Sequence, residues 1–323
     1  MDSANIYLLI LTVFILGFLV NWYRNREAIV AYKRIGFLAA IIFACFELML
    51  LAFTRSQFFM DFSVPLVVLA VGWGILRIWA VVNNGIFFSN QLGIRSFPLI
   101  APRLGLRPAS GETPAVDSFI APLREGATGF WETPVVVETT VSRPIESAAA
   151  PLASIEPEPV APAPISPPAI QWPRYWLTIV GLALAAVAYS AVLFLIAQPR
   201  IAAAIRDAAS ADVRVLTPLS LVLIVEFAFV EELIFRLGIQ NYLGAKLINK
   251  RYGYASAIVL TTVLWTLGHV GSLDPDWVKL LQIFPLGLAL GWLYRKQGIE
   301  STILVHGLFN VLGALVLPPL YLN

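Results

Sequence analysis

Residues 216–238 read LTPLSLVLIVEFAFVEELIFRLG, an apolar run that contains two adjacent glutamates and an arginine near its end. A helix crosses a bilayer with about 20 mostly apolar residues, so this run is long enough to span a membrane. Because an ionisable side chain at bilayer depth is costly, each one needs a partner or a function. The run therefore predicts a membrane helix that carries functional residues.

Seven further apolar runs share this length and character. They cover residues 5–23, 35–53, 62–82, 175–197, 254–270, 278–294 and 301–320. The 323-residue chain is 59% hydrophobic and only 13% charged, whereas soluble domains have about 25% charged residues. This composition excludes a soluble globular enzyme. We expect an all-α polytopic membrane protein with about eight transmembrane helices.

The segment between the third and fourth runs differs in composition from both. Residues 84–172 contain 14 of the 22 prolines, and proline lacks the N–H group that a helix requires. We therefore expect a long, largely disordered linker that joins an N-terminal three-helix membrane unit, 1–83, to a second membrane domain, 173–323. The early part of this linker, with Phe88, Ile94, Phe97 and Leu99, is expected to lie along the membrane surface.

The distribution of basic residues between loops predicts the orientation in the membrane. One side carries the basic clusters at 24–34, 95–107, 246–251 and 295–296. This places the linker in the cytoplasm and both termini outside, although the loop with Arg200, Arg206 and Arg214 is an exception. The net charge of +2 is spread thinly, so no basic stripe for nucleic acid forms. The expected surroundings are a lipid bilayer, in our interpretation a bacterial inner membrane.

The charged residues of the run at 216–238 have a spacing that separates their roles. Glu232 and Arg236 are four apart, share a helix face and can form an ion pair. Glu231 points about 100° away from Glu232 in a helix of 3.6 residues per turn and has no partner on its own helix. An unpaired carboxylate of this kind is a candidate general acid or base.

The only two histidines, His269 and His306, also lie in apolar runs. His306 and Asn310 are four residues apart, so two hydrogen-bonding side chains share one helix face. Trp265 and His269 have the same spacing. Two histidines, an asparagine and a glutamate pair in membrane segments together indicate a functional site rather than isolated packing residues.

These three motifs, in this order, resemble the CPBP family of membrane proteins, which includes the CAAX prenyl proteases and bacteriocin-processing or self-immunity proteins. The family pattern EExxxR, FxxxH and HxxxN corresponds here to Glu231, Glu232 and Arg236, then Trp265 and His269, then His306 and Asn310. Trp265 replaces the usual phenylalanine of the second motif. The resemblance covers about residues 175–320.

The resemblance implies an intramembrane endopeptidase. In such an enzyme, Glu231 and His269 would activate a water molecule, while His306 and Asn310 would donate hydrogen bonds to the oxyanion. Glu232 and Arg236 would support the site structurally, as would Trp265. No cofactor is expected. Two histidines and a glutamate also form a catalytic zinc set, so zinc is the alternative, although the helical HExxH spacing is absent.

Two other functions use similar residues. A proton-coupled transporter also places carboxylates and histidines in membrane helices, but it predicts a repeat of hydropathy between halves, which we do not find. A non-proteolytic scaffold or bacteriocin-immunity protein of the same family could retain the motifs for packing alone. The expected partner of the protease is a peptide or membrane-protein substrate, whose identity the sequence does not specify.

Overall fold

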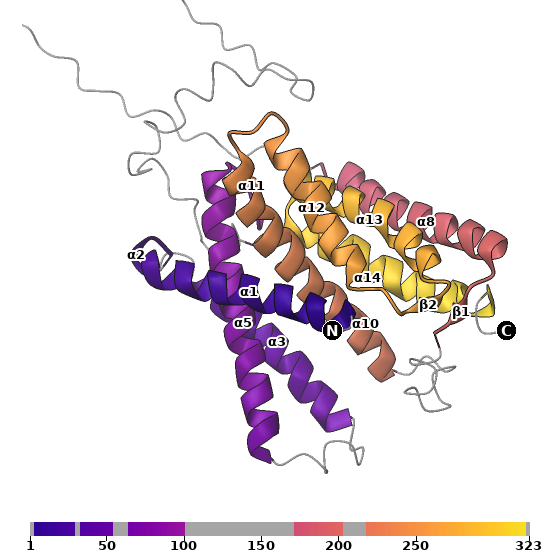
Figure 1. Ribbon diagram of the computed structural model, residues 1–323, viewed down its shortest axis with the longest axis horizontal. Helices are drawn as coiled ribbons and strands as arrows, with labels where there is room; N and C mark the ends of the chain where they lie inside the picture. The colour runs from indigo at the N-terminus through magenta and orange to yellow at the C-terminus, as the bar shows by residue number, and fades with distance from the viewer. Residues whose placement is uncertain (1–2, 30–32, 54–63, 101–170, 203–217, 321–323) are drawn as a thin grey trace, which may run out of the picture. The chain divides into compact units, whose positions relative to one another are not determined.

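The computed structural model describes residues 3–29, 33–53, 64–100, 171–202 and 218–320, and this part of the chain is largely helical (Figure 1). The first half contains α1 (Ser3–Arg24), the short α2 (Arg26–Ile29), α3 (Lys33–Phe53) and α5 (Val64–Gln91). Helix α5 contacts both α1 and α3. Most of the predicted linker, residues 101–170, lies outside the described residues, so its disorder stays a prediction.

The second half contains the motifs on a series of helices. In chain order these are α8 (Trp172–Ala197), α10 (Pro218–Glu232), the π-helix η3 (Leu233–Gln240), α11 (Asn241–Leu247), α12 (Gly253–Leu267), α13 (Asp276–Gln297), α14 (Ile299–Val316) and the 3-10 turn η4 (Pro318–Leu320). A minimal antiparallel pair joins β1 (Arg200–Ile201) to β2 (Leu273–Asp274). Figure 1 shows α12 and α13 beside each other, in agreement with their contacts.

All eight predicted apolar runs overlap helical segments, and four helices of the described part are long and apolar enough to cross a membrane. These are Val71–Gln91 within α5, α8, α13 and α14. Helix α12 and residues Leu9–Arg24 of α1 are apolar but shorter. The chain is an integral membrane protein of mostly helical structure, while the number of eight crossings stays a prediction.

Helix α5 continues to Gln91, past residue 84 where we expected the linker to begin. The chain after it folds back against α14, because the Glu300 carboxylate accepts hydrogen bonds from the backbone N–H groups of Leu99, at 2.9 Å, and Ile100, at 2.7 Å. Phe88 and Ile94 are buried within the protein. Their expected position along the membrane surface was therefore wrong.

One apolar core joins the N-terminal helices to the motif-bearing helices. Its buried members include Phe43 of α3, Ile78 of α5, Leu233 and Leu237 of η3, and Tyr294 of α13. Helices α5 and η3 approach closely, since a Cβ atom at Gly85 would lie 2.5 Å from the carbonyl oxygen of Leu237. The segments Met1–Arg107 and Pro173–Asn323 accordingly form one compact unit.

Candidate active site

The chain changes from α-helix to π-helix directly after the glutamate pair. Helix α10 ends at Glu232, and every residue of η3, from Leu233 to Gln240, is buried. A π-helix has i to i+5 hydrogen bonds and a wider turn than an α-helix, and such segments occur frequently at functional sites. The apolar pattern of the run does not reveal this change.

Glu232 and Arg236 form the ion pair that their spacing predicts. Arg236 Nε lies 3.5 Å from Glu232 Oε2, and both side chains are almost completely buried. The guanidinium group also lies over the ring of Trp265, with 5.2 Å between Cζ and the ring centroid. A carboxylate and an aromatic face therefore compensate the buried positive charge.

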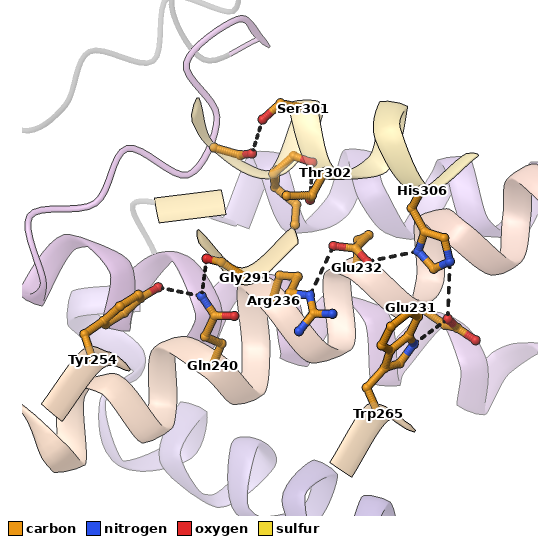
Figure 2. Close-up of polar contacts among 12 residues, drawn as sticks. Glu231, Glu232, Arg236, Gln240, Tyr254, Trp265, Gly291, Ser301, Thr302 and His306 are labelled. Atoms are coloured by element: carbon orange, nitrogen blue, oxygen red, sulfur yellow. Dashed lines mark hydrogen bonds and ion pairs between the residues drawn. The ribbon is translucent and has the colours of Figure 1, made fainter. Parts of the chain in front are cut away.

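Glu231 has its partner on another helix. The indole Nε1 of Trp265, on α12, donates a hydrogen bond of 2.7 Å to Glu231 Oε2 (Figure 2). Trp265 is held in place by α13, where a Cβ atom at Gly287 would lie 3.0 Å from the indole ring. Glu231 is 27% exposed, whereas Glu232 is 1% exposed. The two adjacent carboxylates thus have different surroundings, one accessible and one enclosed.

His306, on α14, lies between the two glutamates. Its Nδ1 is 3.0 Å from Glu232 Oε1, and its Nε2 is 3.8 Å from Glu231 Oε2 (Figure 2). The His306 ring also contacts the edge of the Trp265 ring, with 5.4 Å between centroids. Residues from α10, α12 and α14 therefore meet at one point, which their positions in the sequence alone do not establish.

His269 lies on the turn that follows α12, not within the helix as the apolar run at 254–270 predicts. Helix α12 ends at Leu267, and Gly271, with φ of +84°, supports the left-handed conformation of the turn. His269 Nδ1 lies 3.0 Å from the carbonyl oxygen of Trp265. Because a carbonyl oxygen only accepts, Nδ1 carries the proton in this contact and Nε2 keeps its lone pair.

Two polar side chains of the site, His269 and Asn310, have groups that no described residue uses. His269 is half-buried and forms no ion pair with Glu231 in the described part of the chain. Asn310 lies one helical turn beyond His306, is half-buried, and has no hydrogen bond with any described residue. The free nitrogen of His269 and the amide of Asn310 are therefore both available to a further molecule.

Lys279 is a residue of this region that belongs to none of the three sequence motifs. It lies in the first turn of α13, and its ammonium group donates a hydrogen bond of 3.2 Å to Gln282 Oε1. It also interacts electrostatically with Glu231 and His269. The sequence shows a lysine at the start of an apolar helix, but it does not show that this lysine lies near Glu231 and His269.

Potential metal ligands are few within the described residues. No group of three or more histidine, cysteine, aspartate or glutamate side chains among them is arranged to hold a metal ion. Of the residues expected for a zinc site, His306 Nδ1 contacts Glu232 and His269 Nδ1 contacts a carbonyl oxygen.

Comparison with known protein families gives a match to part of the chain. Residues 214–312 match the family model described as Type II CAAX prenyl endopeptidase Rce1-like. The matched segment contains all three motifs, which confirms the resemblance to the CAAX protease group within the CPBP family. No curated protein and no solved structure matches the chain.

Proposed function

We propose that the protein is an intramembrane endopeptidase that hydrolyses peptide bonds with a water molecule activated by Glu231 and His269. The observation that carries the proposal is the Glu231 carboxylate, fixed at 2.7 Å from Trp265 Nε1 yet still partly exposed. His269 follows Trp265 on the adjoining turn, and in the neutral ring with Nδ1 donating to the Trp265 carbonyl oxygen its Nε2 has a free lone pair. The match at residues 214–312 includes both groups.

The proposed reaction uses these groups in sequence. Glu231 takes a proton from water, His269 Nε2 accepts a hydrogen bond from the same water, and the oxygen attacks the carbonyl carbon of the peptide bond. Asn310 donates a hydrogen bond to the oxyanion that forms, and His306 Nε2 donates a second one in the ring form that carries a proton on both nitrogens, because Nδ1 already donates to Glu232. Glu231 then returns its proton to the leaving nitrogen as the C–N bond breaks. The products are a carboxylic acid and an amine.

Glu232 and Arg236 have a supporting role in this mechanism. Glu232 accepts a hydrogen bond from His306 Nδ1 and is itself paired with Arg236, so it sets the orientation of the imidazole. Such orientation of a ring through its second nitrogen is common in hydrolases. Neither side chain is accessible enough to contact a peptide, because their exposed fractions are 1% and 0%.

The substrate in this proposal is a peptide or a membrane protein that reaches the site within the bilayer. The family description names CAAX prenyl endopeptidases, so a peptide with a prenylated cysteine near its C-terminus is the first substrate to examine. We further propose that catalysis needs no metal, and that the protein lies in a bacterial inner membrane with the linker in the cytoplasm.

Peptide cleavage by the purified, detergent-solubilised protein tests the proposal. A farnesylated CAAX peptide and a peptide library are incubated with the wild type, with Glu231→Gln and with the control Glu226→Gln, and the products are identified by mass spectrometry. Glu226 lies on the same helix and is buried, so Glu226→Gln removes a carboxylate from α10 without changing Glu231. The proposal requires cleavage by the wild type and by Glu226→Gln but not by Glu231→Gln. Cleavage by none of the three would instead favour a non-proteolytic scaffold or immunity protein.

A further inference from the structure

Helix α1 reaches the site from outside the segment that matches the protease family. A Cβ atom at Gly268 would lie 2.6 Å from the phenol oxygen of Tyr7 and 2.5 Å from its ring carbon Cζ. Gly268 directly precedes His269, so the Tyr7 phenol lies against the turn that carries this histidine. Only glycine at position 268 leaves room for this contact.

The position of α1 is fixed by contacts along its length. The Asn84 side chain, on α5, donates a hydrogen bond of 2.9 Å to the carbonyl oxygen of Phe18, and Asn21 donates one of 2.6 Å to Asn84 Oδ1. Phe14 and Phe18 both contact the ring of Tyr242 edge-on. These contacts hold α1 against α5 and α11, and so direct its first turns toward the end of α12.

The hydroxyl group of Tyr7 is available for binding. It forms no hydrogen bond with any described residue, and the side chain is half-buried. It also interacts electrostatically with Glu231. Buried tyrosine hydroxyls usually have a hydrogen-bond partner, so an unused, half-buried hydroxyl against the turn that carries His269 points to a molecule that binds there.

We propose that Tyr7 is a further residue of the substrate site, whose phenol donates a hydrogen bond to a backbone carbonyl group of the bound peptide beside Glu231. The N-terminal helix thereby completes a site whose other residues come from the second half of the chain. This inference rests on the proposed protease function, because it names a group that holds the substrate of the same site.

Kinetics of Tyr7→Phe separate a hydrogen bond from ring packing, since phenylalanine keeps the ring and removes only the hydroxyl. We expect kcat/KM for the farnesylated CAAX peptide to fall about 10-fold, mainly through a higher KM, as for the loss of one hydrogen bond of about 1.4 kcal/mol. The matched control is Tyr23→Phe, because Tyr23 lies on the same helix and is 69% exposed. Unchanged kinetics of Tyr7→Phe would overturn the proposal.

A fluorine label gives a measurement that does not depend on cleavage. 3-Fluorotyrosine is placed at position 7 or at position 23, each in the wild type and in Glu231→Gln, and the ¹⁹F resonance is recorded before and after addition of the farnesylated CAAX peptide. The proposal requires the resonance of position 7 to respond both to the Glu231→Gln change and to the peptide, and that of position 23 to respond to neither.

The two experiments distinguish failure of the inference from failure of the proposed function. If the wild type cleaves the peptide but the ¹⁹F resonance at position 7 does not change on its addition, Tyr7 is not part of the site and the inference is wrong. If the wild type cleaves nothing but position 7 responds to the peptide, the site binds peptide as inferred and the protease function is wrong. An unchanged resonance at position 7 together with no cleavage by the wild type contradicts both the inference about Tyr7 and the proposed protease function.

Discussion

Two polar clusters lie at opposite ends of η3, and they are built from similar residue types. The active-site cluster comprises Glu231, Glu232, Trp265, His269, His306 and Asn310. The amide cluster comprises Gln240, Asn241, Tyr254 and Tyr294, which are all buried. Both clusters lie among apolar helices of the same compact unit, so the polarity of their residues does not distinguish them.

The difference is in how accessible the unused hydrogen-bonding groups are. Gln240 Oε1 has no partner among the described residues but is buried, whereas His269 and Asn310 are half-buried. In the amide cluster, Asn241 donates to Tyr294 and to the carbonyl oxygen of Leu237, and Gln240 donates to Tyr254 and to the carbonyl oxygen of Gly291. In the active-site cluster, one nitrogen of His269 and the amide of Asn310 have no described partner. Donors and acceptors that bond each other hold helices together, whereas unused groups that are accessible can contact a substrate.

The largest expected effect comes from Glu231→Gln, which keeps the shape of the side chain but removes the base. We expect kcat to fall about 10³-fold, the middle of the range for general acid–base catalysis. Unfolding in a denaturing detergent, followed by circular dichroism, should show nearly wild-type stability because Glu231 is partly exposed. A variant that retains more than a tenth of wild-type kcat would contradict the role of Glu231.

Asn310→Ala tests the oxyanion donor at the other end of the site. Loss of one preorganised donor costs about 10²-fold in kcat in known hydrolases, and KM should change little. Steady-state kinetics with the same peptide measure both constants. Unchanged kcat would remove Asn310 from the mechanism and leave His306 as the donor on α14.

Asn241→Leu tests the amide cluster with a side chain of similar shape. We expect a loss of stability of about 2 kcal/mol, because buried carbonyl and hydroxyl partners, including Tyr294, lose a hydrogen bond. The fraction of Asn241→Leu that is folded should keep kcat within about twofold of the wild-type value, because the lost hydrogen bonds lower the free energy of unfolding and belong to the amide cluster. The unfolding curve in a denaturing detergent and kcat of the same variant check this prediction. A large fall in kcat at wild-type stability would show that the amide cluster also takes part in catalysis.

Tyr254→Phe should give the smallest effect of the series. The hydroxyl accepts from Gln240 at 2.9 Å and donates to Asn241 Oδ1 at 3.3 Å. After its loss the Gln240 amide still donates to the carbonyl oxygen of Gly291, and only the longer bond to Asn241 Oδ1 has no replacement. We expect about 1 kcal/mol of destabilisation and wild-type kcat. A larger loss of stability than for Asn241→Leu would show that Tyr254, rather than the asparagine, organises the cluster.

Much of the helical structure could be predicted from the sequence, since hydropathy over about 20 residues is a strong signal. The ion pair of Glu232 and Arg236 could also be predicted, because it depends on spacing within one helix. The start of the linker could not be predicted, because Glu300, about 200 residues away in the chain, binds the backbone of Leu99 and Ile100.

The contacts between helices within the site could not be predicted from the sequence. The hydrogen bond from Trp265 to Glu231 joins residues 34 positions apart, and the contact of His306 with Glu232 joins residues 74 apart. Neither helical periodicity nor composition reports such packing. The turn at His269 had a local signal in Gly268 and Gly271, but the apolar residues around it favoured a longer helix.

The most direct measurement of the central claim is cleavage of the farnesylated CAAX peptide by the wild type and Glu231→Gln, each with and without a metal chelator, with folding checked in the same samples. The account predicts equal wild-type cleavage with and without chelator, and a folded Glu231→Gln variant that cleaves nothing detectable. Loss of wild-type cleavage on chelation, or normal cleavage by Glu231→Gln, would contradict a water molecule activated by Glu231 and His269 without a metal.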